Sequence, residues 1–336
     1  MTVSAPRLLI RLGSMGDVIL ATAAATAYKR RAPASPLDVL VKEEWAPLWS
    51  GHPAVRRVVR WTRGRGALQD TAARLRATGY AEALDLQGSP RTRMLTAVAG
   101  IPARGRPRRH ALQRRALVRW KRGGPPAGYS VLESFVTAAD PSARDLPLLV
   151  PSAAAERRAQ ALLGGAHPVL LAPGARHATK RWPVERFAEL GRRLEAEGTG
   201  PVAVCFGPGE DALREAWTWG WGDGPEWIAV AEPLDVTAAV VQRSRVVVCG
   251  DTGLMHMAAA VGTPVVAVFG PTVTRFGFRP AGVEHRVLET ELSCRPCSVH
   301  GTSSCPQGHF RCMLEVTPAA VEAAVRAVAP ARPAAR

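Results

Sequence analysis

The 336-residue sequence lacks the run of roughly 18 apolar residues that a membrane-spanning helix needs. The longest candidate, residues 254–270, is interrupted by a histidine, a glycine and a proline. Near the start, the short apolar run Leu8–Ile10 is followed at once by Arg11, so we expect no signal peptide. These absences favour a cytosolic protein whose cysteines are reduced.

Acidic residues are also scarce, because 28 Asp and Glu stand against 44 Lys and Arg, a net charge of +16. Such a charge favours a polyanionic partner: nucleic acid, an anionic membrane face or a phosphorylated substrate. Residues 104–122 hold nine basic residues and no acidic one. The segment is either a solvated surface loop or a docking arm for phosphates or an anionic bilayer. Its single aromatic residue, Trp120, argues against a platform for stacking bases.

Short apolar runs alternate with helical patterns along the chain, which predicts an α/β fold with parallel sheets. Expected strands cover residues 7–12, 37–41, 55–61, 83–86, 168–172, 202–206, 227–230, 245–250 and 265–269. Expected helices cover residues 18–31, 67–78, 92–99, 130–139, 153–163, 184–194 and 254–261. The alternation restarts at Val169 after a proline-rich connection, so we expect two similar domains, residues 1–155 and 156–336.

The stretch from Asp251 to His256 lies between two buried-strand patterns and opens a short helix. Asp251 or Thr252 is the expected N-cap, and Gly253 leaves the first turn open to a ligand. Unpaired N–H groups and the positive end of the helix dipole make such a turn suitable for phosphate. A capped helix of this kind occurs in many parallel sheets, but His256 is a polar residue on an otherwise apolar helix, which favours a functional role.

Other loops follow the expected strands and carry polar residues. The turn Gly13–Asp17 lacks the G-x-G-x-x-G spacing, and its Asp17 is either an N-cap or a carboxylate aimed into a cleft. The loop 173–183 carries Lys180, and the loop after residue 206 carries Glu210 and Asp211. Ligands bind at the carboxyl ends of parallel strands. We therefore expect Lys180 and Glu210 or Asp211 to converge with residues 251–256 at one edge of the second sheet.

Four of the six cysteines lie within nineteen residues: Cys294, Cys297, Cys305 and Cys312. Their spacing is that of a candidate structural zinc site, and the alternative is a set of reduced thiols packing a C-terminal lobe. Cys205 and Cys249 fall in expected strands and are interpreted as small buried hydrophobic residues.

Several stretches, in this order along the chain, together resemble glycosyltransferase family 9, the ADP-heptose:lipopolysaccharide heptosyltransferases. They are Arg11–Asp17, Pro173-Gly174 with Lys180–Pro183, Asp251–His256, and Gly262–Pro264 with Phe269–Thr272. The resemblance implies two Rossmann-like domains facing each other across a cleft, the GT-B arrangement. The N-terminal domain would bind the acceptor, and the C-terminal domain would bind the nucleotide-sugar donor and carry the Cys-rich segment 294–312.

The resemblance also implies roles for individual residues. Asp17 matches the family's proposed general base, and Lys180 matches the lysine that meets the donor phosphates. Asp251 matches an acid near the donor sugar, and a further donor-side acid falls on Glu210 or Asp211, which the spacing does not separate. The remaining donor-binding positions are Thr252, Gly253, Leu254 and His256, and the acceptor-side positions are Gly13, Ser14 and Gly16.

The implied reaction is inverting, metal-independent transfer of a heptose or similar sugar from an ADP-sugar to a lipopolysaccharide-core-type acceptor. The implied partners are the ADP-sugar, a phosphorylated lipid-linked acceptor and an anionic membrane surface, with the enzyme cytoplasmic and peripheral at the inner face of the inner membrane. No cofactor is required for catalysis, and a structural zinc is left open. Two alternatives remain: a nucleotide-sugar epimerase on the same scaffold, and a basic nucleic-acid-binding protein. No helix-turn-helix, RNA-recognition or zinc-finger pattern supports the last.

Overall fold

The computed structural model describes residues 4–62, 64 and 66–329, which form two compact units. The first contains the chain up to Arg109 together with Ser130–Ser152, and the second contains His110–Tyr129 together with the chain from Ala153 onward. The segment 110–129 therefore belongs with the C-terminal half, although the chain enters it from the N-terminal half. The outermost residues of the expected domains, 1–3 and 330–336, lie outside the described residues.

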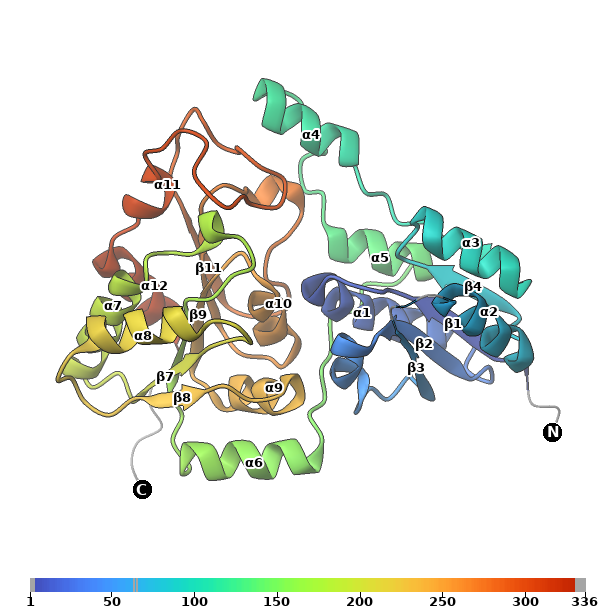
Figure 1. Cartoon of the computed structure of the whole chain (residues 1–336), viewed down its shortest axis with the longest axis horizontal. Coiled ribbons are helices and arrows are strands. Elements are labelled where there is room, and N and C mark those ends of the chain that lie inside the picture. Colours follow the sequence, from blue (N-terminus) through green and yellow to red (C-terminus); the bar gives the residue numbers. More distant parts are fainter. Residues whose placement is uncertain (1–3, 63, 65, 330–336) are drawn as a thin grey trace. The chain divides into compact units, whose positions relative to one another are not determined.

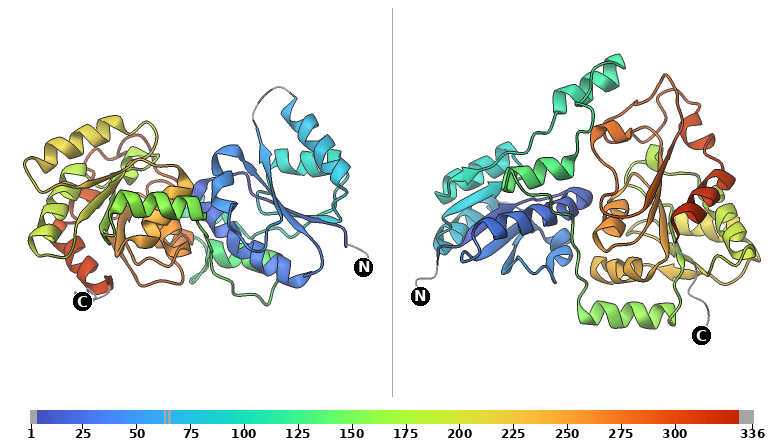
Figure 2. Two further views of the ribbon diagram at one scale, coloured as in Figure 1. Left: turned by 90° about the horizontal axis from the view of Figure 1, so that it is seen from below. Right: turned by 180° about the vertical axis from the view of Figure 1, so that it is seen from behind.

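The first unit is a five-stranded sheet in the order β3-β2-β1-β4-β5, with every neighbouring pair parallel (Figure 1). The strands are β1 (Arg7–Ile10), β2 (Leu37–Lys42), β3 (Arg57–Trp61), β4 (Glu82–Asp85) and β5 (Ala103–Arg104). Helices α1 (Met15–Arg31) and α5 (Val131–Ala139) pack together on one face, and α2 (Ala67–Thr78) and α3 (Pro90–Ala99) cover the other (Figure 2). A 3₁₀ helix, η1 (Glu43–Trp49), follows β2.

Continuous apolar runs form these strands because both faces of the sheet are covered. Leu8, Leu9 and Ile10 of β1 are all fully buried, so the strand has no solvent-facing side. This is the pattern of a parallel sheet between two layers of helices rather than the alternating pattern of a half-exposed antiparallel sheet.

The second unit is a six-stranded parallel sheet in the order β11-β10-β9-β6-β7-β8. Its strands are β6 (Val169–Ala172), β7 (Val202–Cys205), β8 (Ile228–Val230), β9 (Val246–Gly250), β10 (Val265–Phe269) and β11 (His285–Glu289). Helices α7 (Val184–Ala196), α8 (Asp211–Trp221) and α12 (Pro318–Val328) cover one face, and α6 (Ala153–Leu163), α9 (Leu234–Arg243) and α10 (Gly253–Ala260) cover the other (Figure 1). Shorter elements are α4 (Ala111–Trp120), α11 (Arg311–Leu314), η2 (Ala178–Lys180) and η3 (Thr274–Phe276).

Aromatic side chains dominate the core between this sheet and helices α7 and α8. Trp182 and Phe187 meet edge to face with their ring centroids 4.9 Å apart, and Trp217 stacks on Trp221 at 5.1 Å. Gly191 of α7 is required here, because a Cβ at this position would lie 2.5 Å from the Trp221 ring. The close approach of α7 and α8 therefore depends on a residue without a side chain.

The α/β fold with two parallel sheets that the sequence predicts is confirmed, and the helices over residues 67–78 and 153–163 have the predicted bounds. Of the two interpretations of residues 104–122, the surface loop does not hold for residues 111–120, because they form α4. Elements that the sequence analysis did not assign are β5, β11, α4, α8, α9, α11, α12 and the three 3₁₀ helices η1, η2 and η3. No helix in the described part of the chain is both long and apolar enough to span a bilayer.

Strand order reverses at one point in each sheet, and these two points organise the functional residues. In the first sheet β1 lies between β2 and β4, and in the second sheet β6 lies beside β9. Connections leave such neighbouring strands in opposite directions, which opens a crevice at their carboxyl ends where ligands of α/β proteins bind.

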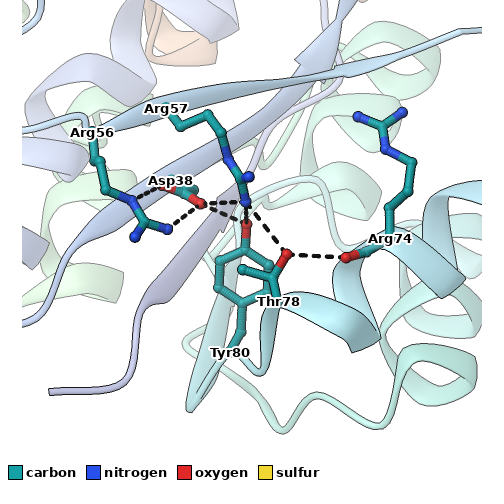
Figure 3. Close-up of polar contacts among 6 residues, drawn as sticks. All are labelled: Asp38, Arg56, Arg57, Arg74, Thr78 and Tyr80. Atoms are coloured by element: carbon teal, nitrogen blue, oxygen red, sulfur yellow. Dashed lines mark hydrogen bonds and ion pairs between the residues drawn. The ribbon is translucent and has the colours of Figure 1, made fainter. Parts of the chain in front are cut away.

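At the opposite, amino-terminal end of the first sheet, a buried carboxylate ties β2 to β3 (Figure 3). Asp38 is fully buried and accepts hydrogen bonds from Arg56 Nε at 2.9 Å, Arg57 Nη2 at 3.0 Å and Tyr80 OH at 2.7 Å. Burial alone would raise the pKa of Asp38, but the hydrogen bonds from Arg56 and Tyr80 and the two guanidinium charges hold this pKa below its ordinary value. The cluster supports the fold and lies far from the carboxyl ends of the strands.

We expect Asp38→Asn to destabilise the protein by about 2 to 3 kcal/mol at neutral pH, because hydrogen bonds to a charged group are lost inside the fold. A carboxyl group whose pKa is lower in the folded state contributes stability above its unfolded pKa, and this contribution is lost as the pH falls through the folded pKa. Urea titrations between pH 7 and pH 3 should therefore show a shallower acid loss in Asp38→Asn than in the wild type. Glu43→Gln is the control, since Glu43 and its partner Arg60 are exposed; equal losses in both variants would contradict the assignment.

Candidate functional site

Lys180 and Asp251 meet at the switch point of the second sheet. Lys180 lies on the loop after β6, and Asp251 directly follows β9, the neighbouring strand. Lys180 Nζ is 2.7 Å from Asp251 Oδ2, and the two side chains are only 16% and 10% exposed. The sequence placed these residues at one edge of the sheet, and the structure brings them into direct contact.

The Lys180–Asp251 pair is fixed from two further directions. The hydroxyl of Thr272, which is buried at the end of the loop after β10, donates to Asp251 Oδ2 at 2.7 Å. A Cβ on Gly250 would lie 2.6 Å from the carbonyl oxygen of Lys180, so glycine lets the loop backbone pass over the end of β9. The carboxylate therefore has little freedom to leave the ammonium, and Thr272 is a site residue to which the sequence analysis gave no role.

The first turn of α10 starts beside this pair. Thr252 is the N-cap and Gly253 is the first helical residue, one position earlier than expected. The N–H groups of the first turn have no partner within the helix, so they can bind an anion. The helix ends at Ala260 with Val261 as its C-cap, and Gly262 adopts φ +85° at the following position, as its place in the sequence predicts.

His256 is buried within the second unit. It is 4% exposed, and its ring lies edge-on to Phe278 with centroids 6.1 Å apart. The guanidinium of Arg114, on α4, lies 5.0 Å from the centroid of the same Phe278 ring. Segment 110–129 is thus joined through one aromatic ring to the helix that starts at the Lys180–Asp251 pair.

The structure separates Glu210 from Asp211. Glu210 Oε2 accepts a hydrogen bond from Gly207 N at 2.7 Å, and the Glu210 carboxylate lies over Gly174, where a Cβ would be 2.2 Å away. Gly174 opens the loop that carries Lys180. Asp211 instead begins α8 and is exposed.

In the first unit, Asp17 is held by its own turn and by Arg11. Ser14 is the N-cap of α1, and its N and Oγ donate to Asp17 Oδ2 at 3.3 Å and 2.9 Å. The interpretation of Asp17 as the N-cap is therefore wrong: it is the third helical residue, which completes a capping box. Arg11 Nη2 lies 2.6 Å from Asp17 Oδ2, and Arg11 is itself buried and donates to the Leu86 carbonyl at 2.9 Å.

The electrostatics of this turn keep Asp17 ionised. Burial raises the pKa of Asp17, but the charge of Arg11 and the hydrogen bonds from Ser14 and Arg11 outweigh it, so the pKa lies below its ordinary value. At neutral pH the side chain is a carboxylate with a fixed direction. Such a group can accept a proton from a hydroxyl that is placed against it.

A cavity of about 510 Å³ adjoins this turn at the carboxyl edge of the first sheet. Its lining comprises Leu12, Gly13, Lys42, Gln87, Ser89, Pro90 and Arg91. A second cavity of about 410 Å³ shares Lys42 and Arg91 with it. Two cations on a shared cavity wall favour an anionic ligand. The sequence analysis did not single out these two residues, although both follow expected strands.

The cysteines do not form the metal site that their spacing suggests. No group of three or more His, Cys, Asp or Glu side chains among residues 4–62, 64 and 66–329 is placed to hold a metal ion. Cys294 Sγ and His309 Nε2 are 3.8 Å apart, and burial raises the pKa of the Cys312 thiol to about 11. None of the six cysteines forms a disulfide, and of the two alternatives for Cys294, Cys297, Cys305 and Cys312 the structural zinc is not supported.

The Cys-rich segment instead braces the loop that carries Lys180. Thr179 Oγ1 donates to the Thr302 carbonyl at 2.9 Å and accepts from Thr302 N at 2.8 Å. Gly301 adopts φ +94°, and a Cβ there would lie 2.9 Å from Lys180 Cγ. The segment therefore packs along the stem of Lys180 and limits where its ammonium can go.

Known proteins of one family resemble this chain. Residues 69–306 match the profile of glycosyltransferase family 9 (heptosyltransferase). Lipopolysaccharide heptosyltransferase 1 of Pseudomonas aeruginosa is 31% identical over 86% of this chain and 85% of its own length. The crystal structure of a family 9 glycosyl transferase from Veillonella parvula superposes with a TM-score of 0.80 at 20% identity, covering 98% of both chains. An E. coli heptosyltransferase with ADP-2-deoxy-2-fluoro heptose gives 0.66 at 20% identity, covering 96% of this chain and 99% of that one.

We expect the Lys180–Asp251 contact to show a coupling energy of about 1 to 3 kcal/mol in a double-mutant cycle of urea stability, because both groups are largely removed from water. The cycle uses Lys180→Met, Asp251→Asn and the double variant. The exposed pair Arg311–Glu315 is the control, and there we expect a coupling of no more than about 0.5 kcal/mol. Equal coupling energies in the two cycles would show that the Lys180–Asp251 pair is an ordinary surface contact.

Proposed function

The chain belongs to glycosyltransferase family 9, as the sequence motifs indicate, and we propose that it transfers a heptose or a similar sugar from an ADP-sugar to a lipopolysaccharide-core-type acceptor. The observation that carries the donor half is the contact between Lys180 and Asp251 beside the first turn of α10. An ammonium and a set of unpaired N–H groups at one strand edge suit a diphosphate. The relative with ADP-2-deoxy-2-fluoro heptose supports the choice of an ADP-sugar.

In this proposal, groups of the protein itself stabilise the negative charge of the donor's diphosphate. As the bond between the anomeric carbon and the diphosphate oxygen breaks, negative charge gathers on the departing ADP. Lys180 and the N–H groups of residues 252–254 stabilise that charge, which is the largest contribution in many enzymes. A metal ion is then not required for the leaving group. Asp251 holds the Lys180 ammonium in place, and His256 supports the first turn of α10 from inside the unit.

Asp17 is the proposed general base. The acceptor hydroxyl attacks the anomeric carbon on the face opposite the diphosphate, its proton passes to the Asp17 carboxylate, and the configuration at carbon inverts. Arg11 and Ser14 fix the direction of the carboxylate through one oxygen. The lowered pKa keeps Asp17 ready to accept a proton throughout the neutral range.

The acceptor is proposed to bind beside the turn Gly13–Gly16, in the cavity whose wall carries Lys42 and Arg91. These cations suit the phosphate groups of a phosphorylated lipid-linked acceptor. On the donor side we assign the second acid to Glu210 rather than Asp211, because only the Glu210 carboxylate lies against the loop that carries Lys180. A lipid-linked acceptor places the enzyme at the cytosolic face of the inner membrane as a peripheral protein, and we propose no nucleic-acid partner.

We expect ADP to raise the melting temperature of the protein, and UDP and NAD to leave it unchanged. At a ligand concentration 100 times its Kd, binding adds about 2.7 kcal/mol to the stability. Lys180→Met should lose most of the ADP effect, whereas Arg311→Met, an exposed cation on another element, should retain it. Stabilisation by UDP and not by ADP would refute the donor assignment.

We expect Asp17→Ala to lower the rate of sugar transfer by roughly 10²–10⁴-fold while leaving ADP affinity nearly unchanged, because a positioned general base contributes that much. Because alanine leaves the buried Arg11 without a counter-charge, Asp17→Asn is measured beside it, with melting temperatures for both. Normal turnover in a folded Asp17→Asn protein would exclude Asp17 from the chemistry. Without an acceptor the wild type should also leave the ADP-sugar unchanged, neither hydrolysed nor epimerised, which separates it from an epimerase or hydrolase.

The pH dependence of kcat/KM tests independently whether Asp17 is the general base. Since burial by itself raises the pKa of Asp17, removing the Arg11 charge should let that pKa rise. The acid limb of kcat/KM should therefore move to higher pH in Arg11→Gln. An acid limb at the same pH in both proteins would mean that the titrating group is not Asp17.

A further inference from the structure

Helix α4 exposes large apolar side chains within the most basic part of the chain. Leu112 is 76% exposed and Trp120 is 65% exposed, although both lie in a regular helix. The surrounding residues 104–122 contain nine Lys and Arg and no Asp or Glu. An exposed Trp and an exposed Leu therefore share one short helix within a strongly basic segment.

The apolar and basic residues fall on one side of the helix. Leu112, Ala116 and Trp120 recur at four-residue intervals, so they form a single stripe. Arg115 and Arg119 are exposed. At about 100° per residue they lie about 60° and about 20° around the helix axis from Leu112, next to that stripe. A helix with an apolar stripe bordered by cations is typical of one that lies in the interface of a bilayer.

The opposite side of α4 is anchored to the second unit. Leu117 is buried, and the Arg114 guanidinium lies over the rings of Tyr129 at 5.5 Å and Phe278 at 5.0 Å. Lys121, at the end of the helix, donates from Nζ to the Pro296 carbonyl at 2.6 Å. The exposed side is thus presented by a helix whose inner side is well packed.

Charge decides which partner fits this surface. A second copy of the chain would bring the same nine cations against the first, and like charges oppose that contact. Nucleic acid would meet the cations but would leave Leu112 and most of the apolar stripe without a partner, and Trp120 is the only aromatic residue of the helix. An anionic bilayer satisfies both, because its headgroups meet the arginines while its interface accepts Trp and Leu.

We propose that α4 docks the protein on an anionic membrane surface, with Leu112 and Trp120 entering the interface and Arg115, Arg119 and Arg122 lying at the phosphates. The proposal rests on the proposed function in one respect: a lipid-linked acceptor gives the docking its purpose. Because α4 is joined through Phe278 to His256 of α10, docking fixes the donor-binding unit itself at the membrane.

The test is co-sedimentation of the full-length protein with vesicles of phosphatidylcholine alone or with 30% phosphatidylglycerol. We expect binding to the anionic vesicles only. The triple variant Arg115→Gln, Arg119→Gln, Arg122→Gln should lower the partition coefficient roughly 100-fold, since each basic residue near an anionic surface contributes a factor of about five. The double variant Leu112→Ser, Trp120→Ser should lower it at least about tenfold.

Trp219→Ser is the matched control, because Trp219 is 87% exposed on α8, away from the basic segment. It should bind vesicles like the wild type. Wild-type binding by both α4 variants, or equal loss in Trp219→Ser, would overturn the proposal. Binding to single-stranded RNA that depends on α4, without binding to vesicles, would also overturn the proposal.

A second measurement separates this proposal from the proposed function. Transfer to a delipidated, soluble acceptor should be unchanged in both α4 variants, whereas transfer to an acceptor embedded in anionic vesicles should fall with the partition coefficient. If the wild type transfers no sugar to the soluble acceptor, the proposed function fails while vesicle binding can still stand. If the variants transfer normally to the embedded acceptor, the docking proposal fails alone.

Discussion

The contact between Lys180 and Asp251 is the interaction on which the second unit's site depends. It joins the loops after two neighbouring strands, β6 and β9, at the point where the strand order reverses. A pair this far from water is costly unless its remaining hydrogen-bonding capacity is satisfied, and Thr272 supplies part of that from a third loop. The pair therefore holds three strand ends in one arrangement. An anion bound beside it would find a cation already oriented, so less ordering is needed at the moment of binding.

The support of Lys180 explains what the Cys-rich segment does in this fold. Its threonine and glycine, rather than its thiols, touch the site: Thr302 pairs with Thr179, and Gly301 lies against the Lys180 stem. Arg295 reinforces the segment by donating to the carbonyls of Phe269 at 3.1 Å and Thr272 at 2.9 Å. The segment thus contacts both the loop of Lys180 and the loop of Thr272. Cysteine spacing pointed to a metal because spacing records separation along the chain and not the directions of the side chains.

Local patterns in the sequence were sufficient for the fold class and for the gathering of Lys180 and Asp251 at one edge of the second sheet. Buried parallel strands such as β10 are unbroken apolar runs with glycine or proline at their ends, and residues placed after them must gather at one edge, as Lys180 and Asp251 do. The order of the strands was beyond such reasoning, because it depends on which runs pair across long separations. Whether Asp17 is an N-cap was left open for a related reason. A serine and an aspartate in one turn are both good caps, and only coordinates show that Ser14 takes the cap while Asp17 completes the capping box.

The basic segment shows why charge alone gave an incomplete account of the chain. Arginine has a good helix propensity, but a run of like charges on a short helix is self-repelling, so the sequence alone did not predict a helix over residues 111–120. The helix forms because Arg114 and Leu117 face the interior of the second unit, where Phe278 and Tyr129 accept the guanidinium on their rings. Packing on one side therefore offsets the repulsion on the other. The same packing leaves Leu112 and Trp120 exposed to water beside the exposed arginines of α4. A helix that presents apolar side chains next to cations is suited to a surface that carries both anionic and apolar groups.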